Sequence, residues 1–152
     1  MLGKNGALAS YSKVANAETN PLQQIVMLYD GAIKFLRLAA SDIENNDLVA
    51  KAEHSTRALD IISYLQSILD FERGGDVAPT LDALYLSVTR VVFRASLELN
   101  APLMNQAADF LTPVRDAWAT IAAQPATESG PVIPSDFSAN KQALVGRQIG
   151  TR

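Results

Sequence analysis

Apolar residues recur at helical spacing in four segments of the chain. The first two run from 21 to about 45 and from 47 to about 71; a third starts between 76 and 80 and reaches 99, and a fourth covers 101–123. Apolar positions at i, i+3, i+4 and i+7 indicate one buried helix face. Short joints between helices favour antiparallel neighbours. The pattern predicts an all-α fold, an antiparallel up-down-up-down four-helix bundle.

Capping residues place the starts of three of these helices. Asn20-Pro21 combines a favoured N-cap residue with a proline at the first helical position, and Asn100-Ala101-Pro102 repeats that arrangement. Asp47 is expected to cap the second helix. The apolar segments therefore have defined beginnings as well as a helical period.

Two breaks interrupt this pattern. Gly74-Gly75 predicts a turn after the second helix, because glycine adopts positive φ at little steric cost. Pro113 falls inside the fourth segment, where it removes one backbone hydrogen bond, so we expect a kink near 108–113.

The domain organisation follows from a change of composition at both ends. Residues 1–19 are small and polar and are expected to form a flexible N-terminal arm. Residues 20–124 hold the bundle, and residues 125–152, rich in proline and glycine, form a C-terminal tail with room for one short helix over 135–144.

Charge and hydropathy exclude two kinds of partner. The formal net charge is −3, the pI is about 5.1, and the 13 basic residues are scattered, which argues against nucleic-acid binding. No segment approaches the length of a membrane-spanning helix, and the N-terminus shows no secretory signal. The absence of cysteine fits a reducing compartment, so a soluble cytoplasmic protein is expected.

Catalytic chemistry has little support in this sequence. The single histidine, His54, has Lys51 rather than glutamate three residues before it, so the Glu-x-x-His pattern of di-metal bundles is absent, and we expect a solvated surface histidine. No nucleophile elbow or phosphate-binding glycine loop occurs. An enzyme, either a hydrolase or a metal oxidase, is therefore disfavoured, and we expect no cofactor and no metal.

The helices carry more apolar side chains than one core seam requires, which favours a protein-binding surface. The candidate contact residues are Leu28, Phe35, Leu38, Tyr64, Leu86, Phe93, Leu97, Met104 and Phe110. Each could instead widen the core, although the seven- and four-residue spacing of Leu86, Phe93 and Leu97 favours a common stripe. We expect Tyr29 and Trp118 in the core, and Tyr85 is undecided because an interior tyrosine needs a partner for its hydroxyl.

Several motifs in register, with matching gaps, resemble the flagellar secretion chaperone family, FliS, over about residues 8–123. These motifs are Ser10-Tyr11-Ser12-Lys13-Val14, Asn20-Pro21-Leu22-Gln23-Gln24-Ile25-Val26-Met27-Leu28-Tyr29-Asp30-Gly31-Ala32, Arg57-Ala58-x-x-Ile61-Ile62-x-x-Leu65, Leu69-Asp70, Gly74-Gly75-Asp76-Val77-Ala78, Leu81-x-x-Leu84-Tyr85 and Val114-Arg115-Asp116-Ala117-Trp118. Two features depart from the family pattern: Pro113 interrupts a helix that is normally continuous, and the tail after Gln124 is longer than in most members.

The resemblance implies a helical bundle that binds flagellin in the bacterial cytosol. Such chaperones hold the disordered C-terminal segment of flagellin, prevent its premature polymerisation and help to deliver it to the flagellar type III export gate. The family's N-terminal tyrosine segment is implicated in substrate and gate engagement, and Tyr11 is the matching position here. The alternative interpretation is a generic helical adaptor or a homodimerising bundle, and the expected state is a monomer or a weak homodimer.

Tyr11 is an isolated aromatic residue in an arm of small residues, and we hypothesise that Tyr11 and Val14 dock on the bundle as a latch over the client surface. The change Tyr11→Ala should then alter affinity for flagellin and speed proteolysis of the arm, both measured on the full chain. Unchanged affinity together with unchanged proteolysis would contradict the latch.

Overall fold

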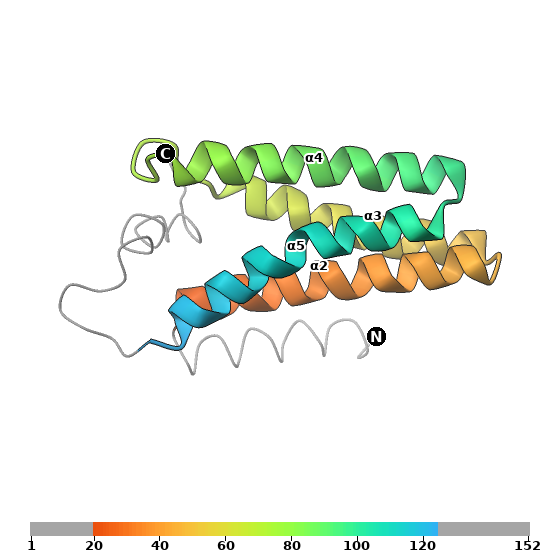
Figure 1. Ribbon diagram of the computed structural model, residues 1–152, viewed down its shortest axis with the longest axis horizontal. Coiled ribbons are helices and arrows are strands. Elements are labelled where there is room, and N and C mark those ends of the chain that lie inside the picture. The colour runs from red at the N-terminus through yellow and green to blue at the C-terminus, as the bar shows by residue number, and fades with distance from the viewer. Residues whose placement is uncertain (1–19, 125–152) are drawn as a thin grey trace.

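The computed structural model describes residues 20–124, which form four helices: α2 (Pro21–Glu44), α3 (Leu48–Ser67), α4 (Val77–Glu98) and α5 (Ala101–Ala122). Successive helices run in opposite directions, and α2 and α4 each lie beside both α3 and α5 (Figure 1). The predicted antiparallel four-helix bundle is confirmed. The predicted arm, 1–19, and tail, 125–152, lie outside the described residues.

Side-chain caps begin three of the helices where the sequence predicted them. The Asn20 side chain accepts a hydrogen bond from the Leu22 N–H at 2.9 Å, and Asp47 accepts one from the Ala50 N–H at 3.1 Å. Asn100 caps α5 in the same way, accepting from Leu103 at 2.9 Å. Each cap satisfies a backbone donor that the first turn leaves unpaired, worth about 1 kcal/mol.

The second helix ends earlier than predicted, at Ser67 rather than near Phe71. The cause is Asp70, whose buried carboxylate accepts hydrogen bonds from the N–H groups of Glu72 and Arg73, both at 3.0 Å. These bonds offer the backbone an alternative to the helix. Gly75 then adopts the positive φ, +53°, that the tandem glycines predicted.

Pro113 lies inside a continuous α5, as expected, and the helix changes direction between its first and second halves (Figure 1). The Thr112 hydroxyl donates to the Ala108 carbonyl at 3.0 Å, one turn before the proline. The missing N–H of Pro113 and the clash of its ring with the preceding turn account for the bend.

Small side chains allow α2 to approach α5 closely. Both helices bury alanines, among them Ala32 and Ala39 on α2 and Ala107 and Ala108 on α5. These two helices share the most extensive contact in the bundle, α3 packs nearly as extensively on α2, and α4 contacts its neighbours less. The core is therefore closed mainly around α2.

Two arginine–aspartate pairs cross from α2 to α5 at the surface. The Arg37 guanidinium lies 2.7 Å from the Asp109 carboxylate, and the Arg115 guanidinium lies 2.7 Å from that of Asp30. Exposed pairs of this kind contribute up to about 1 kcal/mol each. They fix the register of two helices that burial already holds together.

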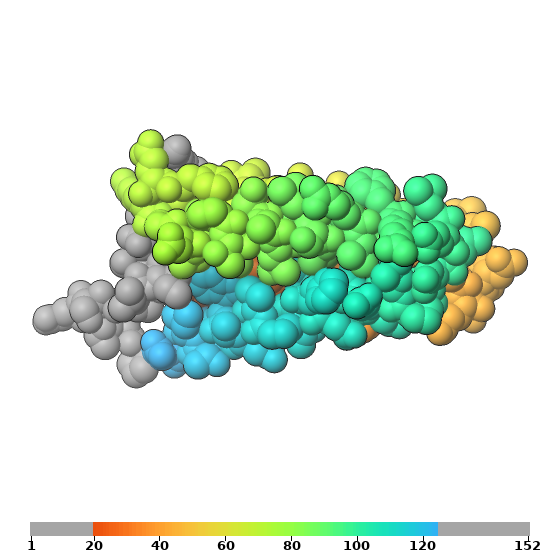
Figure 2. Space-filling model, turned by 45° about the horizontal axis from the view of Figure 1, so that its top comes forward, coloured from red at the N-terminus to blue at the C-terminus, as the bar shows by residue number. Residues whose placement is uncertain are grey.

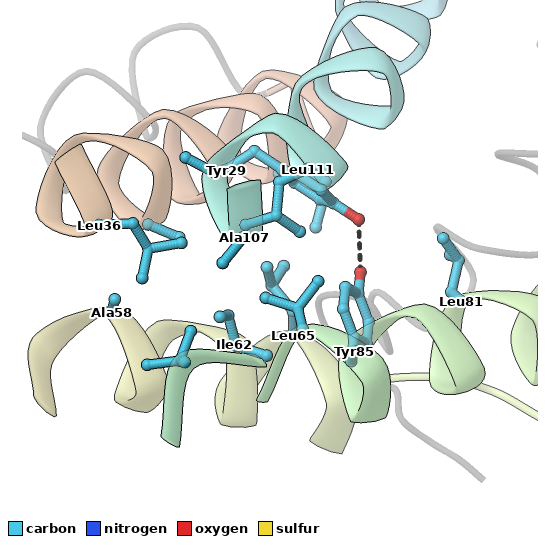
Figure 3. Close-up of a cluster of buried hydrophobic side chains, with 14 of the residues drawn as sticks. Tyr29, Leu36, Ala58, Ile62, Leu65, Leu81, Tyr85, Ala107 and Leu111 are labelled. Carbon is cyan, nitrogen blue, oxygen red and sulfur yellow. Dashed lines mark hydrogen bonds between the residues drawn. The ribbon is translucent and has the colours of Figure 1, made fainter. Parts of the chain in front are cut away.

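A hydrogen bond between two buried hydroxyls joins the diagonal helices α2 and α4. The Tyr29 and Tyr85 oxygens lie 2.7 Å apart in the centre of the core (Figure 3). This pairing answers the open question about Tyr85, and both Tyr29 and Trp118 are buried as predicted. Burial raises the pKa of both tyrosines well above 10.0, and the hydrogen bond with Tyr85 partly opposes the rise at Tyr29.

None of the four described helices is both long and apolar enough to cross a membrane.

Removing both hydroxyls of the tyrosine pair should cost less than the sum of the costs of removing each one alone. Tyr85→Phe leaves the Tyr29 hydroxyl buried without this partner, so we expect a loss of about 1–3 kcal/mol in the free energy of unfolding. The double variant Tyr29→Phe/Tyr85→Phe should lose less than the sum of the single variants. Urea unfolding measures all three; strict additivity would show that the two hydroxyls are not coupled.

The same variants report on the raised pKa values. An unfolded tyrosine loses its proton near pH 10. At that pH the folded pair still holds both of its protons. The stabilisation is therefore complete below pH 10 and lost as the pH rises above it, by up to about 1.4 kcal/mol per pH unit for each tyrosine. The double phenylalanine variant should lack this alkaline component.

Candidate protein-binding surface

Three apolar side chains, Leu86, Phe93 and Leu97, form a row on the outward side of α4, and we name this row the α4 stripe. Their exposed fractions are 41%, 56% and 86%. The core side of the same helix is supplied by other residues, including Val88 and Val92. Figure 2 shows α4 lying lengthwise beside α5, along one long face of the molecule. The α4 stripe is therefore surplus to the core of the described chain.

Polar contacts place one flank of the α4 stripe next to α3. The Gln66 amide of α3 donates to the Asp82 carboxylate at 2.6 Å, and Asp82 lies one turn before Leu86. At the other end, the Lys51 ammonium donates to the Ser96 carbonyl at 3.3 Å. A partner that covers the α4 stripe would thus also meet α3.

The candidates on α2 are engaged at the edge of the core. Leu28 and Phe35 are half-buried and pack against it, and Leu38 is half-buried as well. The Phe35 ring stacks on His54 of α3, with ring centres 6.0 Å apart, and the Arg57 guanidinium lies 5.9 Å from the Phe35 ring centre. These α2 residues combine a core role with partial exposure, so their contact with a partner stays a prediction.

His54 is not the solvated histidine that the sequence suggested. Its Nδ1 atom lies 2.6 Å from a carboxylate oxygen of Asp42 on α2, and its ring is covered on one side by Phe35. It joins α2 to α3 by a hydrogen bond and a stacked ring. Within residues 20–124 no group of three histidine, cysteine, aspartate or glutamate side chains is placed to hold a metal ion.

The prediction that Met104 contacts a partner is wrong, because its side chain is fully buried. Met104 lies three residues before Ala107 and seven before Leu111, both of which are also fully buried, so it belongs to the core face of α5. Phe110 on the same helix is exposed, and so is Tyr64 on α3. Tyr11 and Val14 lie outside the described residues.

Sequence reasoning missed Phe71, which is 52% exposed in the connection between α3 and α4. It was assigned to the end of the second helix, whereas the chain leaves that helix at Ser67. The signal was present: an aspartate at 70, followed closely by Gly74-Gly75, is typical of a side-chain-stabilised turn. The exposure of three other apolar residues at helix ends was not predicted either: Leu48, Val49 and Leu99.

Stability measurements should distinguish the buried Met104 from the exposed Phe93 of the α4 stripe. Met104→Ala should lower the free energy of unfolding by about 2–5 kcal/mol, because it opens a cavity in the core. Phe93→Ser, on the surface, should change it by no more than about 0.5 kcal/mol. Urea unfolding of both variants is the test; equal losses would place Phe93 in the core.

Comparison with known proteins gives one consistent answer. A profile of the family described as flagellar protein FliS matches residues 4–125, which include all four described helices. The flagellar secretion chaperone FliS of Salmonella typhimurium is 36% identical over 104 residues, which cover 68% of this chain and 77% of the relative.

Two further relatives agree. FliS of Campylobacter jejuni is 31% identical over 114 residues, covering 75% of this chain and 89% of its own. FliS of Bacillus subtilis is 30% identical over 109 residues, covering 72% and 80%. The chain therefore belongs to the FliS family of flagellar secretion chaperones.

Proposed function

We propose that this chain binds the C-terminal segment of flagellin in the bacterial cytoplasm, keeps it from polymerising before export and assists its delivery to the type III export gate. The observation that carries the proposal is the exposed α4 stripe on a bundle whose described residues form their core from other side chains. The relatives are named flagellar secretion chaperones, which supports a role in flagellar export.

The distribution of exposed apolar side chains favours an extended client over a compact one. Tyr64 lies on α3, the α4 stripe on α4 and Phe110 on α5, so a single small contact could not cover them all. A disordered segment that orders on binding must bury a large area, on the order of 1,000–3,000 Å², to offset its lost entropy. A client that follows several helices meets that requirement.

In this proposal, bound flagellin cannot polymerise because the bundle covers the side chains that it uses for assembly. A segment that assembles with its neighbours carries apolar side chains for that contact, and these are hazardous while the subunit is free. Laid against the bundle, the same side chains are covered and cannot pair with another flagellin. No cofactor and no covalent step are needed, since release only requires that the client leave the surface.

The alternative is a homodimer in which the α4 stripe of one chain covers that of another. An isologous interface of this kind would bury the same residues on both copies. Sedimentation of the chain with and without the flagellin segment separates the two: a chaperone gives a one-to-one complex, whereas a dimerising bundle stays a dimer and does not take up the peptide.

Phe93→Ser should weaken binding of a synthetic flagellin C-terminal peptide by about tenfold or more, because a large aromatic contact is lost from the interface. Phe71→Ser is the matched control, since Phe71 has nearly the same exposed fraction, 52% against 56%, but lies off the α4 stripe. Calorimetric titration of the full chain gives both affinities.

The control should bind within about twofold of the wild-type chain, because residues outside the contact contribute little to affinity. Equal weakening by the two variants would show that general surface hydrophobicity, and not the α4 stripe, governs binding. A wild-type chain that binds no flagellin peptide would overturn the proposed function.

A further inference from the structure

Arg90 is placed within the α4 stripe and has no partner among the described residues. It lies four residues after Leu86, three before Phe93 and seven before Leu97, so it shares their side of the helix. Its side chain is exposed, and within residues 20–124 it makes no hydrogen bond, ion pair or ring contact.

The other arginines of the bundle are engaged. Four of them have a carboxylate within 4.0 Å: Arg37, Arg73, Arg94 and Arg115. Arg57 lies over the ring of Phe35. The contrast is sharpest with Arg94, one turn further along α4, which is paired with Glu98 at 3.1 Å. On a chain of net charge −3, the α4 stripe thus carries a positive charge that no described residue neutralises.

The α4 stripe offers side chains only, since the backbone of α4 is hydrogen-bonded within its own helix. Strand addition needs a free sheet edge, and the described residues form helices. An amphipathic helix laid along α4 fits the row, which from Leu86 to Leu97 extends about 16 Å at 1.5 Å per residue. The occupant therefore presents apolar side chains at helical spacing.

Covering the α4 stripe removes water from around Arg90. A charge that loses water without gaining a partner is costly, and one that gains a carboxylate in good geometry is not. A client segment with a carboxylate beside its apolar row is thus accepted, whereas one without it is penalised, which is how an interface achieves specificity.

Building on the proposed function, we propose that Arg90 determines specificity: it selects a flagellin segment that binds α4 as an amphipathic helix with an aspartate or glutamate beside its apolar row. The contribution of the arginine is electrostatic and adds to that of the apolar contact. Its effect must therefore depend on salt and on the acidic side chains of the client.

The test is calorimetric titration of the full chain with the synthetic flagellin C-terminal peptide, in wild type and in Arg90→Glu. The matched control is Arg94→Ala/Glu98→Ala, which truncates an arginine of the same helix together with its own partner and leaves the net charge unchanged. A second peptide has every aspartate and glutamate replaced by its amide. Thermal unfolding confirms that the variants fold equally well.

Arg90→Glu should bind the acidic peptide about tenfold or more weakly, because it sets like charges against each other, while the control stays within about twofold. The deficit should shrink between about 0.1 M and 1 M salt, where the screening length falls from about 10 Å to about 3 Å. Wild type and Arg90→Glu should bind the amide peptide equally.

An Arg90→Glu chain that binds the acidic peptide as well as the control does would overturn the inference. So would a deficit that persists with the amide peptide at high salt, because it would mark a steric role. Absence of binding by the wild-type chain would instead remove the proposed function, and this inference with it, so the two failures are distinguishable.

Discussion

The close packing of α2 against both α3 and α5 is the constraint on which the rest of the structure depends. Small side chains such as Ala32 and Ala107 bring α2 and α5 together, and α4 completes the bundle with less extensive contact. The Tyr29–Tyr85 hydrogen bond ties α4 to the opposite helix through the core. Because these contacts use only one side of α4, its outward side stays exposed.

That division explains how a small helical protein can serve as a chaperone. Burial of apolar area stabilises the bundle, while the similar side chains of the α4 stripe stay exposed, as the proposed client contact requires. The bundle needs no rearrangement to present this row. Apolar area alone does not distinguish one client from another. In the proposal above, the charge of Arg90 does so, because a client that leaves this charge unpaired binds at a cost in free energy.

The sequence predicted the elements whose signals are local. Capping by Asn20 and Asn100, the glycine turn and the bend at Pro113 each depend on residues a few positions apart, and all are present. It failed where a tertiary environment decides. The helix period leaves the direction of a residue near the edge of the apolar face uncertain by tens of degrees, and Met104 was assigned to the wrong side.

Contacts between helices were beyond prediction for the same reason. The pairing of His54 with Asp42 joins residues twelve apart in sequence, on two helices whose relative register no local pattern specifies. The exposure of Phe71 depends on Asp70 ending its helix early. The α4 stripe was found because its seven- and four-residue spacing repeats on one helix, which is the scale on which sequence patterns are informative.

The most direct test of the account measures solvent contact at Leu97, with and without the flagellin peptide. A paramagnetic chelate dissolved in the solvent speeds the relaxation of methyl groups that it can approach, and the buried Leu36 serves as an internal reference. The account predicts fast relaxation of the Leu97 methyl groups in the free chain and slow relaxation in the complex, with Leu36 slow in both. Leu97 methyl groups that stay fast in the complex, or are already slow in the free monomer, would contradict it.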